Sequence, residues 1–175
     1  MTKKEVQQRV LRNGKPLPLD EFEWDEKTKT FSSASRYLVL DFLDVSGCTF
    51  NTDPGCTFKT DSECTFDTGW GCTFDTGWDC TFDTGSDCTF DTSSDCTFKT
   101  GSDCTFDTGE RCVVVRRDVY EVIEMDGTKK IKLNSMDAKG YTVVEDEVRE
   151  TIKIGEAEYD KADVEERLKG IKPVN

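Results

Sequence analysis

A single octapeptide, Cys-Thr-Phe-x-Thr-x-x-x, repeats without interruption through the middle of the chain. Each copy keeps Cys, Thr, Phe and Thr at fixed places, while the remaining positions vary among mostly polar residues. A fixed period this short is typical of a β-solenoid, in which stacked units bury a shared core. The repeat therefore indicates the fold class before any other feature is considered. The eight copies run to Arg111 and begin at Cys48, Cys56, Cys64, Cys72, Cys80, Cys88, Cys96 and Cys104.

Strand alternation divides each repeat between two faces. Cys, Phe and the second Thr point one way, while the first Thr and the fourth residue point the other way. We expect Cys, Phe and the second Thr to be inside, with each buried ring contributing about 2 to 3 kcal/mol and cysteine acting as a small apolar filler. The inner Thr needs a hydrogen bond, to a turn amide or a neighbouring Thr. The other face is solvated, because its fourth residue is Asn51, Lys59, Asp67, Asp75, Asp83, Asp91, Lys99 or Asp107.

The contour length of the chain indicates how many repeats make one coil. One repeat spans at most about 27 Å when extended, and crossing twice between sheets about 10 Å apart uses most of it. Two repeats leave roughly five residues per side, the length of Cys-Thr-Phe-x-Thr. We therefore favour a two-sheet solenoid with two repeats per coil. The alternative, one repeat per coil, turns Phe outward and exposes an aromatic ladder that would favour dimerisation.

The turn between repeats often begins with glycine, which suits a positive φ. Asp53, Asp61 and Ser93 stand at this position in the other three copies, so the requirement is not strict. The glycines at this first turn position are Gly69, Gly77, Gly85, Gly101 and Gly109.

The flanks of the array predict three domains. Residues 1–37 form an N-terminal cap, in which Glu21–Trp24 and Thr28–Phe31 alternate as a hairpin would. Residues 38–118 form the solenoid. Leu40 and Phe42 lie eight residues before Cys48 and Phe50, and we interpret them as a degenerate first repeat. At the far end, Val114 takes the place of Phe.

Residues 119–175 predict a small C-terminal α+β module. Val119–Met125 and Lys129–Leu133 read as paired strands around an Asp126-Gly127 turn. Residues 141–144 and 148–154 are further strand candidates. A short helix begins after Asp160 and ends at about Gly170, with Pro173 just beyond.

Charge and composition narrow the function classes. The net charge is −13 and the chain has no histidine. A deficit of Lys and Arg argues against direct binding to nucleic acid or to an anionic membrane, and it favours a basic protein partner or mimicry of nucleic-acid charge. The chain has no long apolar stretch and no signal-peptide pattern, so we expect a cytoplasmic protein.

The cysteines offer one candidate site. In the two-repeat coil they form two columns with neighbours about 4.8 Å apart, and Cys64, Cys80 and Cys96 then become possible ligands for a thiophilic metal. Zinc sites use closely spaced Cys-x2-4-Cys pairs, and no such pair occurs here. The nine cysteines also cannot all pair with one another. We favour packed core thiols and expect no cofactor.

Surface side chains offer the other candidates. Asp67, Asp75, Asp83 and Asp91 are expected to form acidic rows, which mimic a nucleic-acid backbone or simply keep the rod soluble. Large aromatic residues on polar turns are candidate contact points. The two that stand on the turns of adjacent repeats are Trp70 and Trp78.

Catalysis has little support in the sequence. The chain lacks histidine, a Gly-x-Ser-x-Gly nucleophile elbow, a phosphate-binding loop and any Cys-His pair. We therefore expect a protein that is not an enzyme.

Several segments together resemble octapeptide-repeat proteins of unknown function from phages and their bacterial hosts. The resemblance covers roughly residues 13 to 118, and it implies a mobile-element context without any catalytic residues. The segments are Asn13-Gly-Lys-Pro-Leu, Phe22-x-Trp-Asp-Glu-Lys-Thr-Lys-Thr-Phe-Ser-Ser, Leu38-Val-Leu-Asp-Phe, the repeat array and Cys112-Val-Val-Val-Arg-Arg-Asp.

Three functional hypotheses follow. The first is a non-enzymatic structural or protein-binding repeat protein of phage or prophage origin, in the cytoplasm of a bacterial host or associated with a virion. Its partner is a host or phage protein, and the chain is a monomer or a homo-oligomer through a sheet face or its caps. The second is an acidic inhibitor that mimics nucleic acid against a host enzyme or defence complex. The third is a thiolate metal binder.

Overall fold

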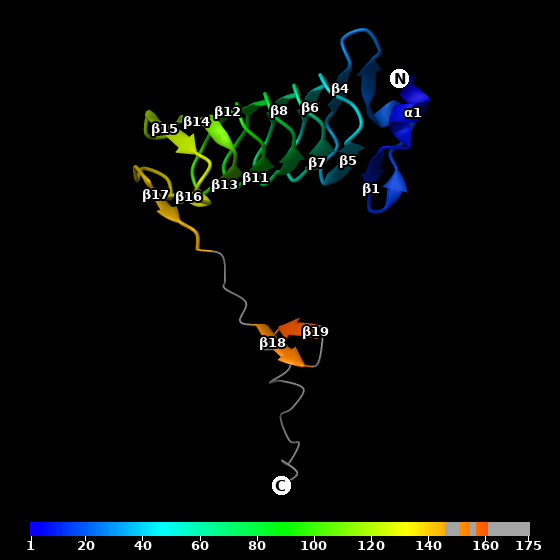
Figure 1. Ribbon diagram of the computed structural model, residues 1–175. Coiled ribbons are helices and arrows are strands. Elements are labelled where there is room, and N and C mark those ends of the chain that lie inside the picture. The colour runs from blue at the N-terminus through cyan, green and yellow to red at the C-terminus, as the bar shows by residue number, and fades with distance from the viewer. Residues whose placement is uncertain (146–150, 155–156, 161–175) are drawn as a thin grey trace. The chain divides into compact units, whose positions relative to one another are not determined.

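The computed structural model describes residues 1–145, 151–154 and 157–160. The chain divides into two compact units, residues 1–144 and 145–175. In the first unit the strands wind alternately through two sheets, and successive coils stack side by side (Figure 1). The predicted class, an all-β two-sheet solenoid, is confirmed for this unit. No helix in the described residues is long and apolar enough to cross a membrane.

Each coil contains two repeats. Parallel strands pair residues sixteen positions apart, so that Phe66 lies beside Phe82 in one sheet and Phe74 beside Phe90 in the other. This register confirms the two-repeat coil and excludes one repeat per coil. Sheet A holds β5 (Leu38–Phe42), β7 (Thr57–Thr60), β9 (Thr73–Thr76), β11 (Thr89–Thr92) and β13 (Thr105–Thr108). Sheet B holds β4 (Thr30–Ser33), β6 (Thr49–Thr52), β8 (Thr65–Thr68), β10 (Thr81–Asp83), β12 (Thr97–Thr100) and β14 (Glu110–Arg116).

Phenylalanine fills the space between the sheets. Along sheet B the rings of Phe66 and Phe82 stack with centroids 4.8 Å apart and planes 3° from parallel. Across the core Phe74 meets Phe82 edge to face, at 5.1 Å and 75°. Both geometries are favoured by the ring quadrupole, at about 0.5 to 1.5 kcal/mol per pair beyond area burial. The Phe, Cys and second Thr side chains of the repeats are all buried, as the alternation predicts.

The buried threonines find a different partner from the one expected. Thr60 and Thr100 donate from Oγ1 to the carbonyl of the next residue, at 3.1 and 3.2 Å. This acceptor is the first carbonyl of the turn, whereas the sequence suggested a turn amide or another Thr. Among the described residues, four inner threonine hydroxyls have no partner: Thr52, Thr68, Thr76 and Thr108.

The turn glycines have a role that the sequence reading missed. None of the first-position glycines has a positive φ, so that expectation was wrong. Positive φ falls instead on the third turn position, where Asp79 and Asp87 adopt 55° and 59°. Where glycine occupies the first position, the reason is space: a Cβ on Gly77 would lie 2.2 Å from Ser62 Oγ and 2.8 Å from its amide nitrogen.

The degenerate first repeat, which contains Leu40 and Phe42, is shifted by two positions from the expected register. Leu40 pairs with Phe58, and Phe42 pairs with Thr60. Leu40 therefore takes the place of Phe in the coil and Phe42 the place of the inner Thr. The shift arises because five residues separate Phe42 from Cys48, whereas three separate Thr60 from Cys64. At the far end Val114 pairs with Phe98, as predicted.

The N-terminal end of the solenoid is closed. The expected hairpin forms between β3 (Glu23–Asp25) and β4, but β4 also begins the parallel sheet, with Phe31 beside Phe50. A short helix with a capping box at Thr2 buries Val6 against this end. The remaining elements here are α1 (Lys3–Gln7), β1 (Val10–Arg12), β2 (Lys15–Pro16) and a 3-10 helix (Leu19–Glu21).

The C-terminal end corrects a predicted hairpin. The strands β15 (Glu121–Asp126) and β16 (Ile131–Leu133) exist, but they do not pair with each other. β15 extends sheet B by pairing with β14, and β16 extends sheet A by pairing with β13. The Asp126-Gly127 turn therefore carries the chain from one sheet to the other, because each sheet offered an unpaired edge.

The remaining strands complete the two units. β17 (Tyr141–Val143) pairs with β16, so residues 119–143 join the solenoid sheets, and the chain divides at 144 rather than at 118. In the second unit β18 (Thr151–Ile154) pairs with β19 (Ala157–Asp160). β18 covers part of the predicted 148–154 strand, and the predicted helix after Asp160 lies outside the described residues.

Replacing a core ring should unfold the solenoid far more readily than replacing its outward neighbour. Phe82→Ala removes a ring that is 1% exposed and should lower the free energy of unfolding by about 3 to 5 kcal/mol. Thr81→Ala, on the outward face of the same strand, should change it by about 0.5 kcal/mol or less. Denaturant titration measures both, and equal small losses would contradict the Phe core.

Two glycine substitutions in the repeat turns should affect stability in the reverse order from the one that φ alone predicts: the glycine with negative φ should be the more sensitive. Gly77→Ala places a methyl group against Ser62 and should cost about 1 to 3 kcal/mol. Gly71→Asp should be close to neutral, although Gly71 has φ +66°, because nothing lies within 4 Å of its Cβ and Asp79 adopts the same conformation. Thermal denaturation of the two variants separates spatial crowding from backbone strain.

Candidate functional site

The thiols line the two edges of the core. Cys64, Cys80 and Cys96 are consecutive members of one column, because their strands pair in register. Each thiol is directed at backbone carbonyls of the turns: Cys96 Sγ donates to Ser94 O and to Gly77 O, both at 3.6 Å. The second acceptor belongs to the preceding coil. Cysteine thus fills the edge of the core and also donates hydrogen bonds to turn carbonyls of two successive coils.

Burial raises the pKa of the thiols, whereas hydrogen bonds from column neighbours lower the pKa of Cys64, Cys96 and Cys104. Burial raises the pKa of Cys56. Hydrogen bonding with Cys64 and Cys96, together with burial, raises the pKa of Cys80. A thiolate is the species that binds metal and reacts as a nucleophile, and the burial of all nine thiols keeps aqueous ions and reagents away from them. Among the described residues, no group of three or more Cys, Asp or Glu is placed to hold a metal ion.

The native protein should therefore hide its thiols from an aqueous thiol reagent. All nine cysteines are free and buried. We expect negligible reaction with Ellman's reagent in the folded state at pH 8, and nine equivalents after denaturation in guanidinium. Rapid reaction of several thiols in the native state would contradict the packed columns.

The two candidate tryptophans do not form one contact point. Trp70 lies in a turn from sheet B to sheet A, and Trp78 in a turn from sheet A to sheet B, so they stand on opposite edges of the solenoid. Their side chains are 53% and 51% exposed. Their neighbours along each edge differ too: Gly85 crowds against Trp70, whereas the amide of Trp78 donates to Ser62 Oγ.

The four candidate aspartates also separate into two rows. Asp67 and Asp83 are adjacent on sheet B, while Asp75 and Asp91 are adjacent on sheet A. A period of sixteen residues places alternate repeats on opposite faces, so the predicted acidic rows lie one on each sheet. The sheet A pair continues into Asp107, which follows Asp91 in register and was not among the predicted site residues.

On sheet B the negative charge is largely compensated. Lys99 Nζ lies 2.8 Å from Asp83, and Arg117 donates to the same carboxylate at 2.5 Å. Arg117 also donates to the carbonyl of Thr84. Asp83 is therefore held by two cations, which makes it a poor binding group for a basic partner.

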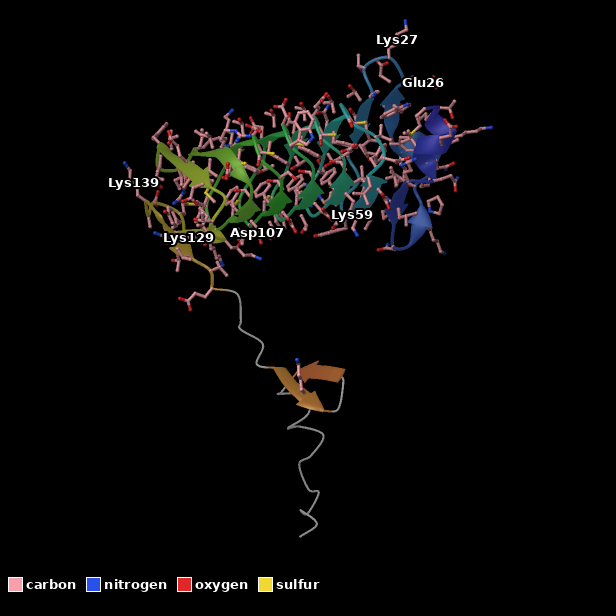
Figure 2. The ribbon with its side chains drawn as sticks, viewed as in Figure 1. Glu26, Lys27, Lys59, Asp107, Lys129 and Lys139 are labelled. Carbon is pink, nitrogen blue, oxygen red and sulfur yellow. The ribbon has the colours of Figure 1, made fainter. Side chains whose placement is uncertain are left out.

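On sheet A the charge accumulates instead. We name Asp75, Asp91 and Asp107 the sheet A acidic row; Figure 2 shows Lys59 and Asp107 on this face of the solenoid. Burial raises the pKa of Asp91, and the charges of Asp107 and Asp75 raise it further, with Lys130 opposing them. Lys130 lies 3.7 Å from Asp107 at one end of the row, and Lys59 stands beside Asp75 in register at the other end, so two lysines flank three aspartates. The row thus has more negative charge than its neighbours neutralise.

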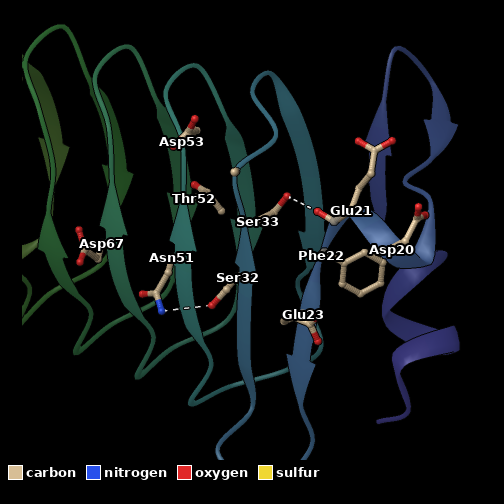
Figure 3. Close-up of a pocket in the computed structure, with 11 residues that line it drawn as sticks. Asp20, Glu21, Phe22, Glu23, Ser32, Ser33, Asn51, Thr52, Asp53 and Asp67 are labelled. Atoms are coloured by element: carbon tan, nitrogen blue, oxygen red, sulfur yellow. Dashed lines mark hydrogen bonds between the residues drawn. The ribbon is translucent and has the colours of Figure 1, made fainter.

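A groove opens at the N-terminal end of sheet B. It has a volume of about 520 Å³, with Asp67 on one side and Asp20 on the other (Figure 3). Several of its acids are already paired, as Glu21 is with Arg12 and Asp53 with Arg36 at 3.5 Å. The groove is acidic and open, but its charge is more fully compensated than that of the sheet A acidic row.

Two aspartate variants should shift stability in opposite directions with pH. The pKa of Asp91 is raised, so its ionised form destabilises the fold at neutral pH. Asp91→Asn should raise the melting temperature at pH 7, and the gain should vanish as pH falls below the ordinary Asp value of about 3.9.

The matched control is Asp95. Hydrogen bonds from Arg111 lower its pKa, so its ionised form stabilises the fold above the ordinary pKa and loses this effect as pH falls. Asp95→Asn should lower the melting temperature at pH 7 and have little effect near pH 2.5. Melting curves across pH 2.5 to 7 test both signs, and a loss of stability in Asp91→Asn at pH 7 would contradict the repulsive row.

The chain matches no protein-family model, no curated protein and no solved structure.

Proposed function

We propose that this chain is a non-enzymatic protein-binding repeat protein that docks a basic segment of another protein on the sheet A acidic row. The partner is a host or virion protein that presents Lys or Arg from an extended or helical segment. The rigid ladder fixes the spacing of the carboxylates, so little side-chain and backbone order is lost on binding.

The accumulation of charge in one register supports the proposal. Three consecutive strands each present an outward aspartate, and the central one, Asp91, has a raised pKa because of burial and its two neighbours. A basic partner relieves this repulsion, which adds to the attraction between opposite charges. Sheet B offers no such gain, because Asp83 already binds Lys99 and Arg117.

Mimicry of nucleic-acid charge is the second candidate, and the charge density of the rows counts against it. Neighbouring aspartates along a sheet are about 4.8 Å apart, whereas duplex DNA has one charge per about 1.7 Å of axis. The sheet B row is also interrupted by Lys99. A metal-thiolate function has weaker support still, because the thiols are buried and bonded to turn carbonyls.

A phage or prophage origin, and hence the cytoplasm of a bacterial host as the place of action, belongs to the same proposal. Its support is the resemblance of residues 13–118 to octapeptide-repeat proteins of phages and their hosts.

An affinity capture from a bacterial lysate tests the proposed function. The full chain should capture a basic protein, Asp91→Lys should lose it, and Asp67→Lys should retain it, because Asp67 carries the same charge change on sheet B. The captured protein should elute at raised salt, since exposed charge pairs are screened. Equal capture by both variants would exclude the sheet A acidic row. Release of the partner by competing duplex DNA would favour mimicry instead.

A further inference from the structure

The C-terminal end of the solenoid has two unpaired strand edges. β15 is the last strand of sheet B and β17 the last strand of sheet A, and no described strand pairs with their outer edges. Exposed edges present rows of backbone donors and acceptors that readily pair with another chain. The N-terminal end differs, because α1 packs there and buries Val6.

The core is also open at this end. Tyr141 and Val143 lie across from Leu133 and Ile131, so they share the face that these two residues turn toward the core. Leu133 and Ile131 are 1% and 2% exposed, whereas Tyr141 and Val143 are 47% and 42% exposed. Apolar side chains that face the core direction but remain exposed mark a surface that a further layer would cover.

The two edges differ in charge. On sheet B, Glu124 lies opposite Val113 on the outward face of β15, and Asp126 follows on the same strand. On sheet A, Lys132 lies opposite Thr105 on the outward face of β16. Lys129 and Lys139 add positive charge at this end of the chain's first unit (Figure 2). The edge strand of sheet B is thus acidic, whereas the edge strand of sheet A, β17, is uncharged and has lysines beside it.

We propose that two copies of this chain associate end to end through these edges, with β15 of each copy beside β17 of the other. A two-fold axis parallel to the strands produces this arrangement and uses both edges of both copies. It places Tyr141 and Val143 at the junction of the two cores. Lys132, one strand in from its edge, then stands on the same broad face as Glu124 of the second copy.

Charge selects this pairing over the other symmetric one. A two-fold axis perpendicular to the sheets would put β15 against β15 and β17 against β17. The acidic strand, with Glu124 and Asp126, would then face itself, and like charges on adjacent strands are destabilising. The unlike pairing instead places the acidic edge beside the uncharged β17 and its neighbouring lysines. It also leaves one sheet A acidic row on each broad face of the dimer, so the inference does not depend on the proposed function.

Charge reversal at the two edges tests the proposal in the full-length chain. The wild type should sediment as a dimer at about 50 μM, a concentration within the usual range for modest interfaces. Glu124→Lys or Lys132→Glu alone should weaken dimerisation at least about tenfold. The double variant Glu124→Lys/Lys132→Glu should restore it, because each copy then presents the exchanged pair.

Glu26→Lys is the matched control, since it makes the same charge change in the hairpin at the opposite end (Figure 2). It should leave the dimer unchanged. Unfolding curves of all variants should coincide at low protein concentration, which separates loss of association from loss of fold. A monomeric wild type at 50 μM, or a dimer that neither single reversal weakens, would overturn the proposal.

Discussion

The stack of phenylalanine rings is the interaction on which the rest of this structure depends. One ring per repeat meets its neighbour face to face along the sheet and edge to face across the core, as Phe82 does with Phe66 and Phe74. This packing sets the distance between the sheets and leaves room at the corners only for a small side chain. Cysteine fits there and donates to turn carbonyls, while threonine occupies the opposite corner of the strand. One repeat therefore forms one side of a coil, and the contacts between coils come from stacking.

The outward positions are free to vary because they contribute little to that core. A change of charge on one face therefore does not disturb the fold, and the two faces differ in charge. Sheet B compensates Asp83 with Lys99 and Arg117, whereas sheet A leaves Asp91 between two other aspartates. The same rigid ladder that makes the repeat stable also holds these carboxylates in a line. That combination of a fixed scaffold and an incompletely compensated row underlies the proposed protein-binding function.

Strand alternation and contour length were enough to predict the buried face and the two-repeat coil, because both follow from local geometry. Features that depend on the next coil were harder to predict. Gly77 is needed because Ser62 of the preceding coil approaches it, not because of its own φ. The Asp126-Gly127 turn resembles a hairpin locally, yet the open sheet edges compete for its two strands. The sequence identified the candidate residues individually but not the surface that each belongs to. Stacking places Asp67 and Asp75 on different sheets, and Trp70 and Trp78 on opposite edges. Stacking also adds Asp107 to the sheet A acidic row.

The spacing of outward positions along one sheet tests the two-repeat coil most directly. Thr49 and Val113 lie on the outward face of sheet B, four strands apart through β8, β10, β12 and β14. Spin labels attached to unnatural amino acids at these two positions would leave the native thiols untouched. Pulsed electron paramagnetic resonance should give a backbone separation of about 19 Å, which is four strand spacings. A separation of about 38 Å, eight spacings, would mean one repeat per coil and would contradict the account.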